Sequence, residues 1–334
     1  MSLPVVRDAR REDCREVQRL IQELADFERM PNGPKIDAKV LERDGFDLSP
    51  PLYHCFVVDD PSDPTKLIGY AIYFLGFGTM VGRRMYLEDI YITEKYRKKH
   101  LGNALFQKVA QKGLEMNCAD MEFIVLNWNP AQEFYKARGA RDVTKEEGWH
   151  LFRIGGESLQ KIAESKTKSS LIVRDARKDD CSEVLRLIQE LADFEKTGFT
   201  QLSAQDIEQD FFSCDRPLFH CVVVEDPDDT SKLIGYSIYY NHYGTWTGRR
   251  MYLRDIFVNV AYRGKHIGDA LLREVAQKAV ETGCVDMDFI VVDWNPAQAF
   301  YKARGATDIT LSEAWHLCRV NKDDLRKVAE GKNY

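Results

Sequence analysis

The 334-residue sequence lacks the features that mark several classes of protein. It has no run of about 18 apolar residues, which a membrane-spanning helix requires. Its first ten residues lack the apolar core of a secretory signal. With 47 Lys and Arg against 53 Asp and Glu, its net charge of -6 argues against a nucleic-acid-binding face. We therefore expect a cytoplasmic protein with no membrane or nucleic-acid partner.

Two further absences exclude particular kinds of functional site. The eight cysteines form no CxxC pair, so no metal site is expected. Six of them recur between the two halves of the chain beside apolar residues, which is typical of reduced, buried thiols: Cys14, Cys55, Cys118, Cys181, Cys221 and Cys284. The GxGxxG fingerprint is missing, which excludes a Rossmann dinucleotide enzyme.

The sequence does contain one long internal repeat. CREVQRLIQELADFER at Cys14 returns as CSEVLRLIQELADFEK at Cys181, and WNPAQEFYKARGA at Trp128 returns as WNPAQAFYKARGA at Trp294. Only two copies occur, each long enough to bury its own core. We expect a first domain at 4–163 (copy one), a polar linker at 164–170 and a second domain at 171–334 (copy two).

Each copy alternates strands with helices, which predicts a layered α/β fold. In copy one, apolar spacing predicts a helix after Asp13, a candidate N-cap, and another from near Leu101. Asn129 is expected to cap a short helix that ends before Gly139. Strands are expected at residues 5–7, 53–58, 67–74, 84–92, 121–126 and 149–154.

Two motifs in each copy carry candidate chemistry. A turn rich in Arg, Lys, His and Gly precedes a helix at 94–103 and at 261–269. Helix N-termini present unpaired N–H groups, and glycine lets that backbone approach a phosphate closely. The motif NPxxxFYKxRGA places Tyr135 and Tyr301 in a short helix. There a hydroxyl can donate a proton, or the ring can simply pack with its hydroxyl in water.

In this order and spacing, the YLED strand, the RxxxxG turn and WNPAQxFYKxRGA resemble the GNAT acetyltransferase superfamily. The ELAxFE helix end, the PLYHC strand and the EEGWHLF tail are similar to the spermidine/spermine and thialysine N-acetyltransferases within it. The resemblance covers nearly all of each copy. It implies two mixed-sheet α+β GNAT folds, packed as a pseudo-dimer because relatives are two-fold dimers. It also implies acetyl-CoA as co-substrate and no metal.

The resemblance assigns residues to the coenzyme. The backbone of the central strand would pair with the pantetheine, and the turn would wrap the pyrophosphate. The family's glycine in that turn is replaced by His100 and His266, and histidine tolerates a left-handed backbone better than bulky residues do. The candidate contacts are Ile90, Ile92, Arg97, Lys98, His100, Gly102, Asn103 and Asn129, and in copy two Ile256, Val258, Arg263, Gly264, His266, Gly268, Asp269 and Asn295.

The resemblance to this family also assigns catalytic and substrate-binding roles. Tyr135 and Tyr301 would protonate the leaving thiolate, and Glu88 would help to deprotonate the amine. An alkyl ammonium has a pKa near 10, so only about one molecule in a thousand is nucleophilic at pH 7 and a base is needed. The amine would attack acetyl-CoA directly. The candidate substrate contacts are Phe27, Glu28, Asp89, Glu195, Trp246 and Asp255, and across a pseudo-dimer Trp246 and Trp315 would complete the site around Glu88.

Copy two has Arg254 where copy one has Glu88. At roughly 4 Å and an effective dielectric near 20, a charge pair is worth about 4 kcal/mol, so Arg254 repels a cationic amine. It can serve an acidic substrate group or form a structural ion pair with Asp255. The sequence thus predicts an N-acetyltransferase for polyamines, diamines or thialysine-like amines, with copy one active. The alternatives are a GNAT enzyme with another amine substrate such as protein lysine, and a partly degenerate CoA-binding protein with at most one active copy.

Overall fold

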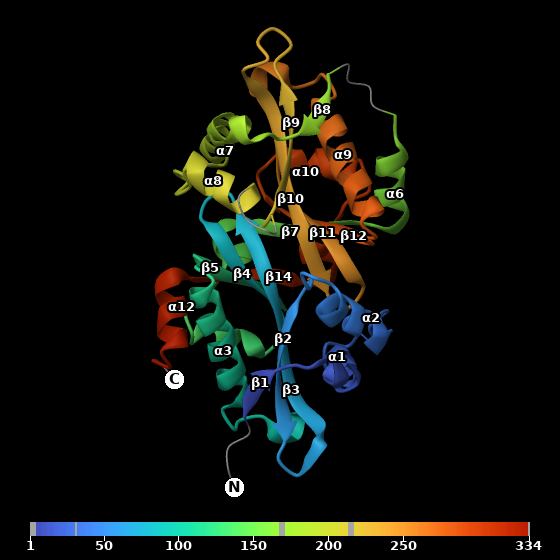
Figure 1. Cartoon of the computed structure of the whole chain (residues 1–334), viewed down its shortest axis with the longest axis vertical. Helices are drawn as coiled ribbons and strands as arrows, with labels where there is room; N and C mark the ends of the chain where they lie inside the picture. The colour runs from blue at the N-terminus through green and yellow to red at the C-terminus, as the bar shows by residue number, and fades with distance from the viewer. Residues whose placement is uncertain (1–4, 31, 167–170, 213–216, 333–334) are drawn as a thin grey trace.

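The computed structural model describes residues 5–30, 32–166, 171–212 and 217–332, so residues 167–170 of the expected linker lie outside the described part. The molecule is elongated, with copy one at one end and copy two at the other (Figure 1). Each half is built on a mixed sheet of seven strands. The expected mixed α/β fold is confirmed, and the two copies pair within one chain.

Among the described residues, copy one contributes thirteen regular helices and strands. It also has two 3-10 turns at Arg11–Asp13 and Glu94–Tyr96 and a π-helical turn at Arg43–Asp47. Its strands are β1 (Val6–Asp8), β2 (His54–Asp60), β3 (Asp63–Gly78), β4 (Gly82–Ile92), β5 (Asp120–Leu126), β6 (Ala140–Asp142) and β7 (Trp149–Gly155). Its helices are α1 (Cys14–Phe27), α2 (Ala38–Glu42), α3 (Leu101–Glu115), α4 (Ala131–Lys136), α5 (Val143–Glu147) and α6 (Gly156–Glu164).

Copy two repeats this order, with 3-10 turns at Lys178–Asp180 and Val260–Tyr262. Its strands are β8 (Val173–Asp175), β9 (His220–Glu225), β10 (Leu233–Gly244), β11 (Gly248–Val258), β12 (Asp286–Val292), β13 (Thr307–Asp308) and β14 (Trp315–Asn321). Its helices are α7 (Cys181–Glu195), α8 (Ala204–Phe211), α9 (Ile267–Glu281), α10 (Ala297–Lys302), α11 (Ile309–Glu313) and α12 (Lys322–Ala329).

The longer elements form where the sequence predicted them, with one correction at the start of α1. The helix buries Val17, Leu20 and Ile21 on one face, as the apolar spacing indicates. Asp13, however, does not cap it through its side chain. Its carboxylate instead accepts a hydrogen bond from the Arg10 N–H at 2.7 Å and pairs with Arg7 at 2.7 Å. The Asp13 side chain therefore links β1 to the turn before α1 and does not cap the helix.

The two copies exchange their last strands. In the first sheet the order is β1-β2-β3-β4-β5-β14-β6, so β14 of copy two lies between two strands of copy one. In the second sheet β7 of copy one lies between β12 and β13. The following helices are exchanged as well: α12 packs on α3 and α6 packs on α9, as Figure 1 shows. Each folded half therefore combines residues from both copies.

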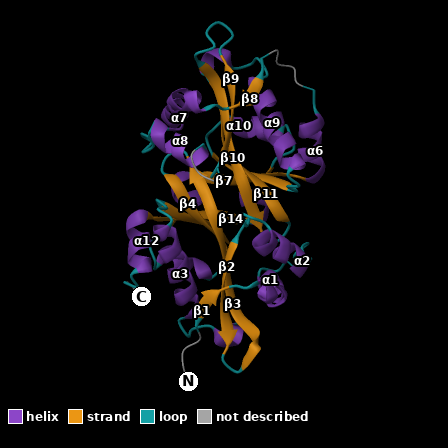
Figure 2. Cartoon of the chain, viewed as in Figure 1, coloured by secondary structure: helices purple, strands orange, loops and turns teal. Residues whose placement is uncertain are grey.

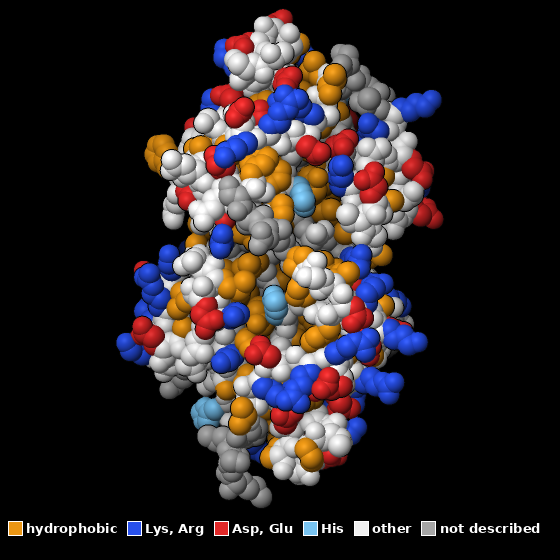
Figure 3. Space-filling model, viewed as in Figure 1, with side chains coloured by type: hydrophobic (Ala, Val, Ile, Leu, Met, Phe, Trp, Pro, Cys, Tyr) orange, Lys and Arg blue, Asp and Glu red, His pale blue; other side chains and the backbone are white. Residues whose placement is uncertain are grey.

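This exchange ties the halves together. Val320, Leu325 and Val328 are buried in the core of copy one, among side chains such as Leu105 and Phe123. Burying one such aliphatic side chain stabilises the fold by about 1.5–3 kcal/mol. The sheets run through the middle of the molecule with helices on their flanks (Figure 2). On the face shown in Figure 3, acidic and basic side chains are interspersed, and hydrophobic side chains gather at the waist where the halves meet.

Candidate active site

In each half the sheet opens beside its central strand. The parallel pairing of β4 with β5 covers only Arg84–Tyr86 against Asp120–Glu122. Beyond Tyr86, the β5 side of β4 has no strand partner among the described residues, and this length of strand lines a cavity. Backbone N–H and C=O groups there are available to an extended ligand. The pairing of β11 with β12 is equally short, at Arg250–Tyr252.

Glu88 of copy one and Arg254 of copy two, which occupy equivalent positions but carry opposite charge, each lie on a β-bulge. The register of β3 and β4 passes from Ile72–Asp89 to Tyr73–Leu87, so Glu88 is the extra residue. In copy two the register passes from Ile238–Asp255 to Tyr239–Leu253, so Arg254 takes the same place. Bulges turn side chains away from the regular alternation and occur often beside active sites.

The turns before α3 and α9 adopt the backbone that the family's glycines imply. His100 and His266 are left-handed, with φ of 62° and 58°. Lys98 has φ of 61°, where Gly264 of copy two has φ of 80°. A left-handed conformation costs a residue with a Cβ roughly 1–2 kcal/mol. Both turns keep the shape of a glycine loop, and copy one bears two strained residues to do so.

These turns fit an anionic ligand. In copy one a cavity of about 670 Å³ is lined by Arg97, His100, Gly102 and Asn103. The N–H groups in the first turn of a helix lack intrahelical partners, and the helix dipole favours negative charge there. At Gly102 the space is open, because a Cβ would meet nothing nearer than 3.9 Å. The residues present therefore fit the diphosphate of a coenzyme.

The arginine of each turn also contacts the acceptor side of the cleft. Arg97 Nε donates to the Ile92 carbonyl at 3.0 Å, and its guanidinium lies 4.7 Å from the centre of the Phe27 ring. In copy two, Arg263 Nε donates to the Val258 carbonyl at 3.1 Å, and its guanidinium lies 4.9 Å from the Phe194 ring. The coenzyme turn and the end of the first helix are thus in direct contact.

The acceptor cavity of copy one, of about 630 Å³, gathers three carboxylates near a tyrosine: Glu28, Glu88, Asp89 and Tyr135 line it. Glu88 Oε1 accepts a hydrogen bond from the Thr245 N–H of copy two at 3.3 Å. Asp89 accepts one from the Tyr70 hydroxyl at 2.8 Å. The sequence did not predict Thr245 here.

Burial and mutual repulsion raise the proton affinity of these carboxyls. Burial and the Asp89 charge raise the pKa of Glu28 to about 8. Burial, followed by repulsion from Asp89, likewise raises the pKa of Glu88. Tyr135 packs against Phe123 with ring centres 4.4 Å apart, and burial raises the pKa of its hydroxyl. The site therefore combines carboxyls that bind a proton more tightly than usual, and accept one once ionised, with a phenol that keeps its proton at neutral pH.

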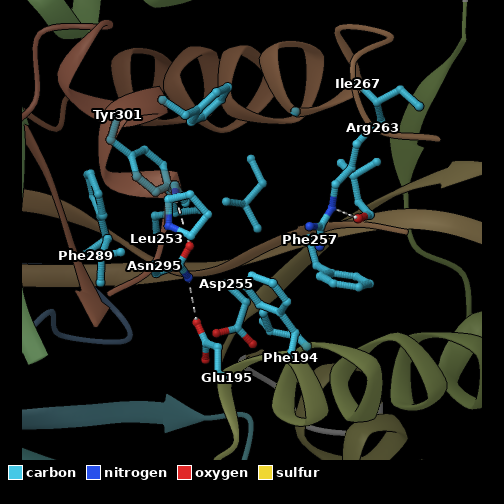
Figure 4. Close-up of a pocket in the computed structure, with 18 of the residues that line it drawn as sticks. Phe194, Glu195, Leu253, Asp255, Phe257, Arg263, Ile267, Phe289, Asn295 and Tyr301 are labelled. Atoms are coloured by element: carbon cyan, nitrogen blue, oxygen red, sulfur yellow. Dashed lines mark hydrogen bonds between the residues drawn. The ribbon is translucent and has the colours of Figure 1, made fainter. Parts of the chain in front are cut away.

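Copy two has one cavity of about 470 Å³ that takes in both the turn before α9 and the carboxylates, shown in Figure 4. Glu195, Asp255, Asn295 and Tyr301 lie around it, with Asn295 Nδ2 donating to Glu195 Oε1 at 3.4 Å. Burial and the Asp255 charge raise the pKa of Glu195 to about 7. Arg254 lines the same cavity, and its Nε lies 3.6 Å from Asp255 Oδ1. The ion pair, one of the two roles that the sequence left open for Arg254, therefore forms.

Every candidate site residue of the sequence lines one of these three cavities. Trp246 and Trp315 of copy two stand in the wall of the cavity that contains Glu88, as a pseudo-dimer requires. The sequence missed several residues of that wall, among them four polar ones: Arg153, Thr245, Arg250 and Glu313. The local sequence gives no signal for them, because they reach this cavity only in the folded chain. Arg153 lies on the exchanged strand β7 and Glu313 directly before the exchanged strand β14, whereas Thr245 and Arg250 lie at the turn between β10 and β11 and on β11.

A model of the Acetyltransferase (GNAT) family matches residues 17–140 and again residues 185–306. The chain therefore belongs to this family and contains its domain twice. It is an acyltransferase. Thialysine N-epsilon-acetyltransferase from Bos taurus is 39% identical over 169 residues, which are 49% of this chain and 99% of that protein. Spermidine/spermine N(1)-acetyltransferase-like protein 1 from Homo sapiens is 42% identical over 163 residues, 47% of this chain and 23% of that protein.

Solved structures share the doubled fold. A GCN5-related N-acetyltransferase from Sphaerobacter thermophilus aligns over 95% of both chains with a TM-score of 0.51 and 15% identity. A tandem GNAT protein from the clavulanic acid biosynthesis pathway aligns over 96% of this chain and 98% of its own, with a TM-score of 0.50 and 13% identity. Within the described ranges no helix has the length and apolar character needed to cross a membrane. Over the same residues, no group of three or more His, Cys, Asp or Glu side chains is placed to hold a metal ion.

Proposed function

We propose that this protein transfers the acetyl group of acetyl-CoA to a primary amine of a small polyamine, diamine or thialysine-like molecule, and that copy one performs this reaction. The observation that carries the proposal is the cluster of Glu28, Glu88 and Asp89 in one cavity with Tyr135. Three carboxylates attract a cationic amine and accept its proton. The names of the relatives, thialysine and spermidine/spermine acetyltransferases, agree with this class of acceptor.

The chain's own groups account for the proton movements. Acetyl-CoA supplies the acetyl thioester, and Arg97, His100 and the first turn of α3 are suited to hold its diphosphate. Glu88, on the bulge, takes the ammonium proton directly or through water, which frees the nitrogen lone pair for attack. Tyr135 gives its proton to the departing thiolate. The second proton that the nitrogen loses when the amide forms returns through water to Tyr135. The side walls from copy two, including Trp246 and Trp315, enclose the acceptor and restrict its water.

The experiment is a panel of amines with acetyl-CoA, read by release of the free thiol over a range of pH. We expect 1,4-diaminobutane and longer polyamines to be acetylated, with kcat/KM falling as the pH drops below about 8. Below the raised pKa of Glu28 and Glu88 these carboxyls are protonated, so they neither attract the cation nor accept its proton. Glu88→Gln is expected to lower kcat/KM by about 100-fold.

A lysine-containing peptide is the comparison substrate. Peptide acetylation without diamine acetylation contradicts the proposal, as does a Glu88→Gln variant with undiminished kcat/KM. Because Gln has the shape of Glu, the variant is checked for an unchanged melting temperature.

A further inference from the structure

The cavity of copy two contains a buried cation, the guanidinium of Arg254, and the described residues do not provide a hydrogen-bond acceptor for each of its N–H groups. Arg254 is only 9% exposed and lines the cavity beside Glu195 and Asp255. Among the described residues, its Nε and Nη1 groups have no hydrogen-bond acceptor. The ion pair with Asp255 is long, at 3.6 Å from Nε. A guanidinium taken out of water needs acceptors for its five N–H groups, so this position favours a further anion.

The carboxylates nearby are already engaged. Asp255 accepts a hydrogen bond from the Tyr236 hydroxyl at 3.1 Å. Glu122 of copy one acts on Arg254 electrostatically, but it pairs with Arg84 and accepts from Arg319 Nη2 at 2.6 Å. The described part of the chain therefore supplies Arg254 with compensating charge but gives its Nε and Nη1 groups no hydrogen-bond acceptor.

The corresponding place in copy one has the opposite character. There the cavity contains the three carboxylates Glu28, Glu88 and Asp89, whereas copy two offers two carboxylates and the guanidinium of Arg254. The copy-one cavity also extends between the halves to six side chains of the exchanged strands and copy two. Of the residues around the copy-two cavity, only Trp149 comes from copy one. The space beside Arg254 thus suits a shorter acceptor with less positive charge.

We propose that copy two acetylates a short amine that also carries a carboxylate, with the carboxylate on Arg254 and the amine beside Glu195. This inference rests on the proposed function. The amine nitrogen forms a bond to the acetyl carbon and the carbon–sulfur bond breaks. The bonding electron pair leaves on sulfur, which takes the proton of Tyr301. The nitrogen loses two protons in the reaction: the ammonium proton passes to Glu195 before the attack, and the second leaves when the amide forms and returns through water to Tyr301. Guanidinium and carboxylate match in shape and charge, so Arg254 selects the acceptor by a charge-assisted pair.

The test uses the full chain with copy one silenced by Glu88→Gln and Tyr135→Phe. Three acceptors of equal length are compared: 4-aminobutanoate, butylamine and 1,4-diaminobutane. We expect 4-aminobutanoate to have the highest kcat/KM, about 10- to 100-fold above 1,4-diaminobutane. Adding Arg254→Gln is expected to remove this preference, Arg254→Lys to keep part of it, and Arg254→Glu to reverse it. Melting temperatures show that each variant is folded.

The results separate this inference from the proposed function. Wild-type protein that acetylates 1,4-diaminobutane supports the function of copy one whatever copy two does. If the silenced chain acetylates none of the three acceptors, prefers the diamine, or keeps its preference in the Arg254→Gln variant, the assignment of copy two is wrong. If the wild-type chain releases no thiol with any amine, the proposed function itself fails.

Discussion

Tyr135→Phe is expected to lower kcat for acetylation of 1,4-diaminobutane by about 100- to 10,000-fold, the range that a positioned proton donor contributes. The substitution removes one hydroxyl and keeps the ring that packs on Phe123 and Phe106, so the fold and KM should change little. Without the phenol, the thiolate must leave unprotonated or take its proton from water. Steady-state kinetics with a thiol reagent measures the effect.

Tyr301→Phe is the matched comparison, since Tyr301 packs on Phe289 at the same 4.4 Å ring distance. With 1,4-diaminobutane it is expected to retain most of the activity, because Arg254 disfavours a dication in copy two. Loss of diamine acetylation in Tyr301→Phe together with full activity in Tyr135→Phe would show that the active copy has been assigned wrongly.

Deletion of residues 315–334 is expected to unfold copy one, although these residues belong to copy two in the sequence. The deletion removes β14 from between β5 and β6 and α12 from the surface of α3. It takes at least four buried side chains out of the copy-one half: Cys318, Val320, Leu325 and Val328. At about 1.5–3 kcal/mol each, their loss is comparable with the 5–15 kcal/mol that usually stabilises a domain.

Point variants test the same exchange more gently. Leu325→Ala is expected to lower the free energy of unfolding by about 2–5 kcal/mol, since this side chain is fully buried against α3. Lys322→Ala, on the exposed start of α12, should change it by less than about 0.5 kcal/mol. Thermal unfolding and diamine acetylation are measured together. A deleted chain that still acetylates diamines at the wild-type rate would contradict the exchanged topology.

Much of this arrangement follows from local sequence. The amphipathic spacing of α1, the apolar strands and the turn at Asn129 are local signals. The Asn129 side chain accepts a hydrogen bond from the Ala131 N–H at 2.9 Å, although Pro130, not Asn129, occupies the N-cap position of α4. The left-handed backbone at His100 follows from the glycine that relatives have there. The Asp13 cap was wrong because Arg7 and the Arg10 N–H compete for its carboxylate.

The rest depends on tertiary structure. The segments 149–155 and 315–321 read as strands in either arrangement, because their pattern does not specify which sheet receives them. The exchange in turn decides that Arg153 and Trp315 line the cavity of Glu88. The bulge at Glu88 and the unpaired donors of Arg254 are also set by register and burial, which residue spacing alone does not encode.

The central claim is that the turns before α3 and α9 each hold the diphosphate of one coenzyme molecule, and calorimetric titration of the full chain with acetyl-CoA tests it most directly. Two molecules bound per chain are predicted, one at each cleft. A titration that detects no binding, or a single molecule per chain, would contradict the claim.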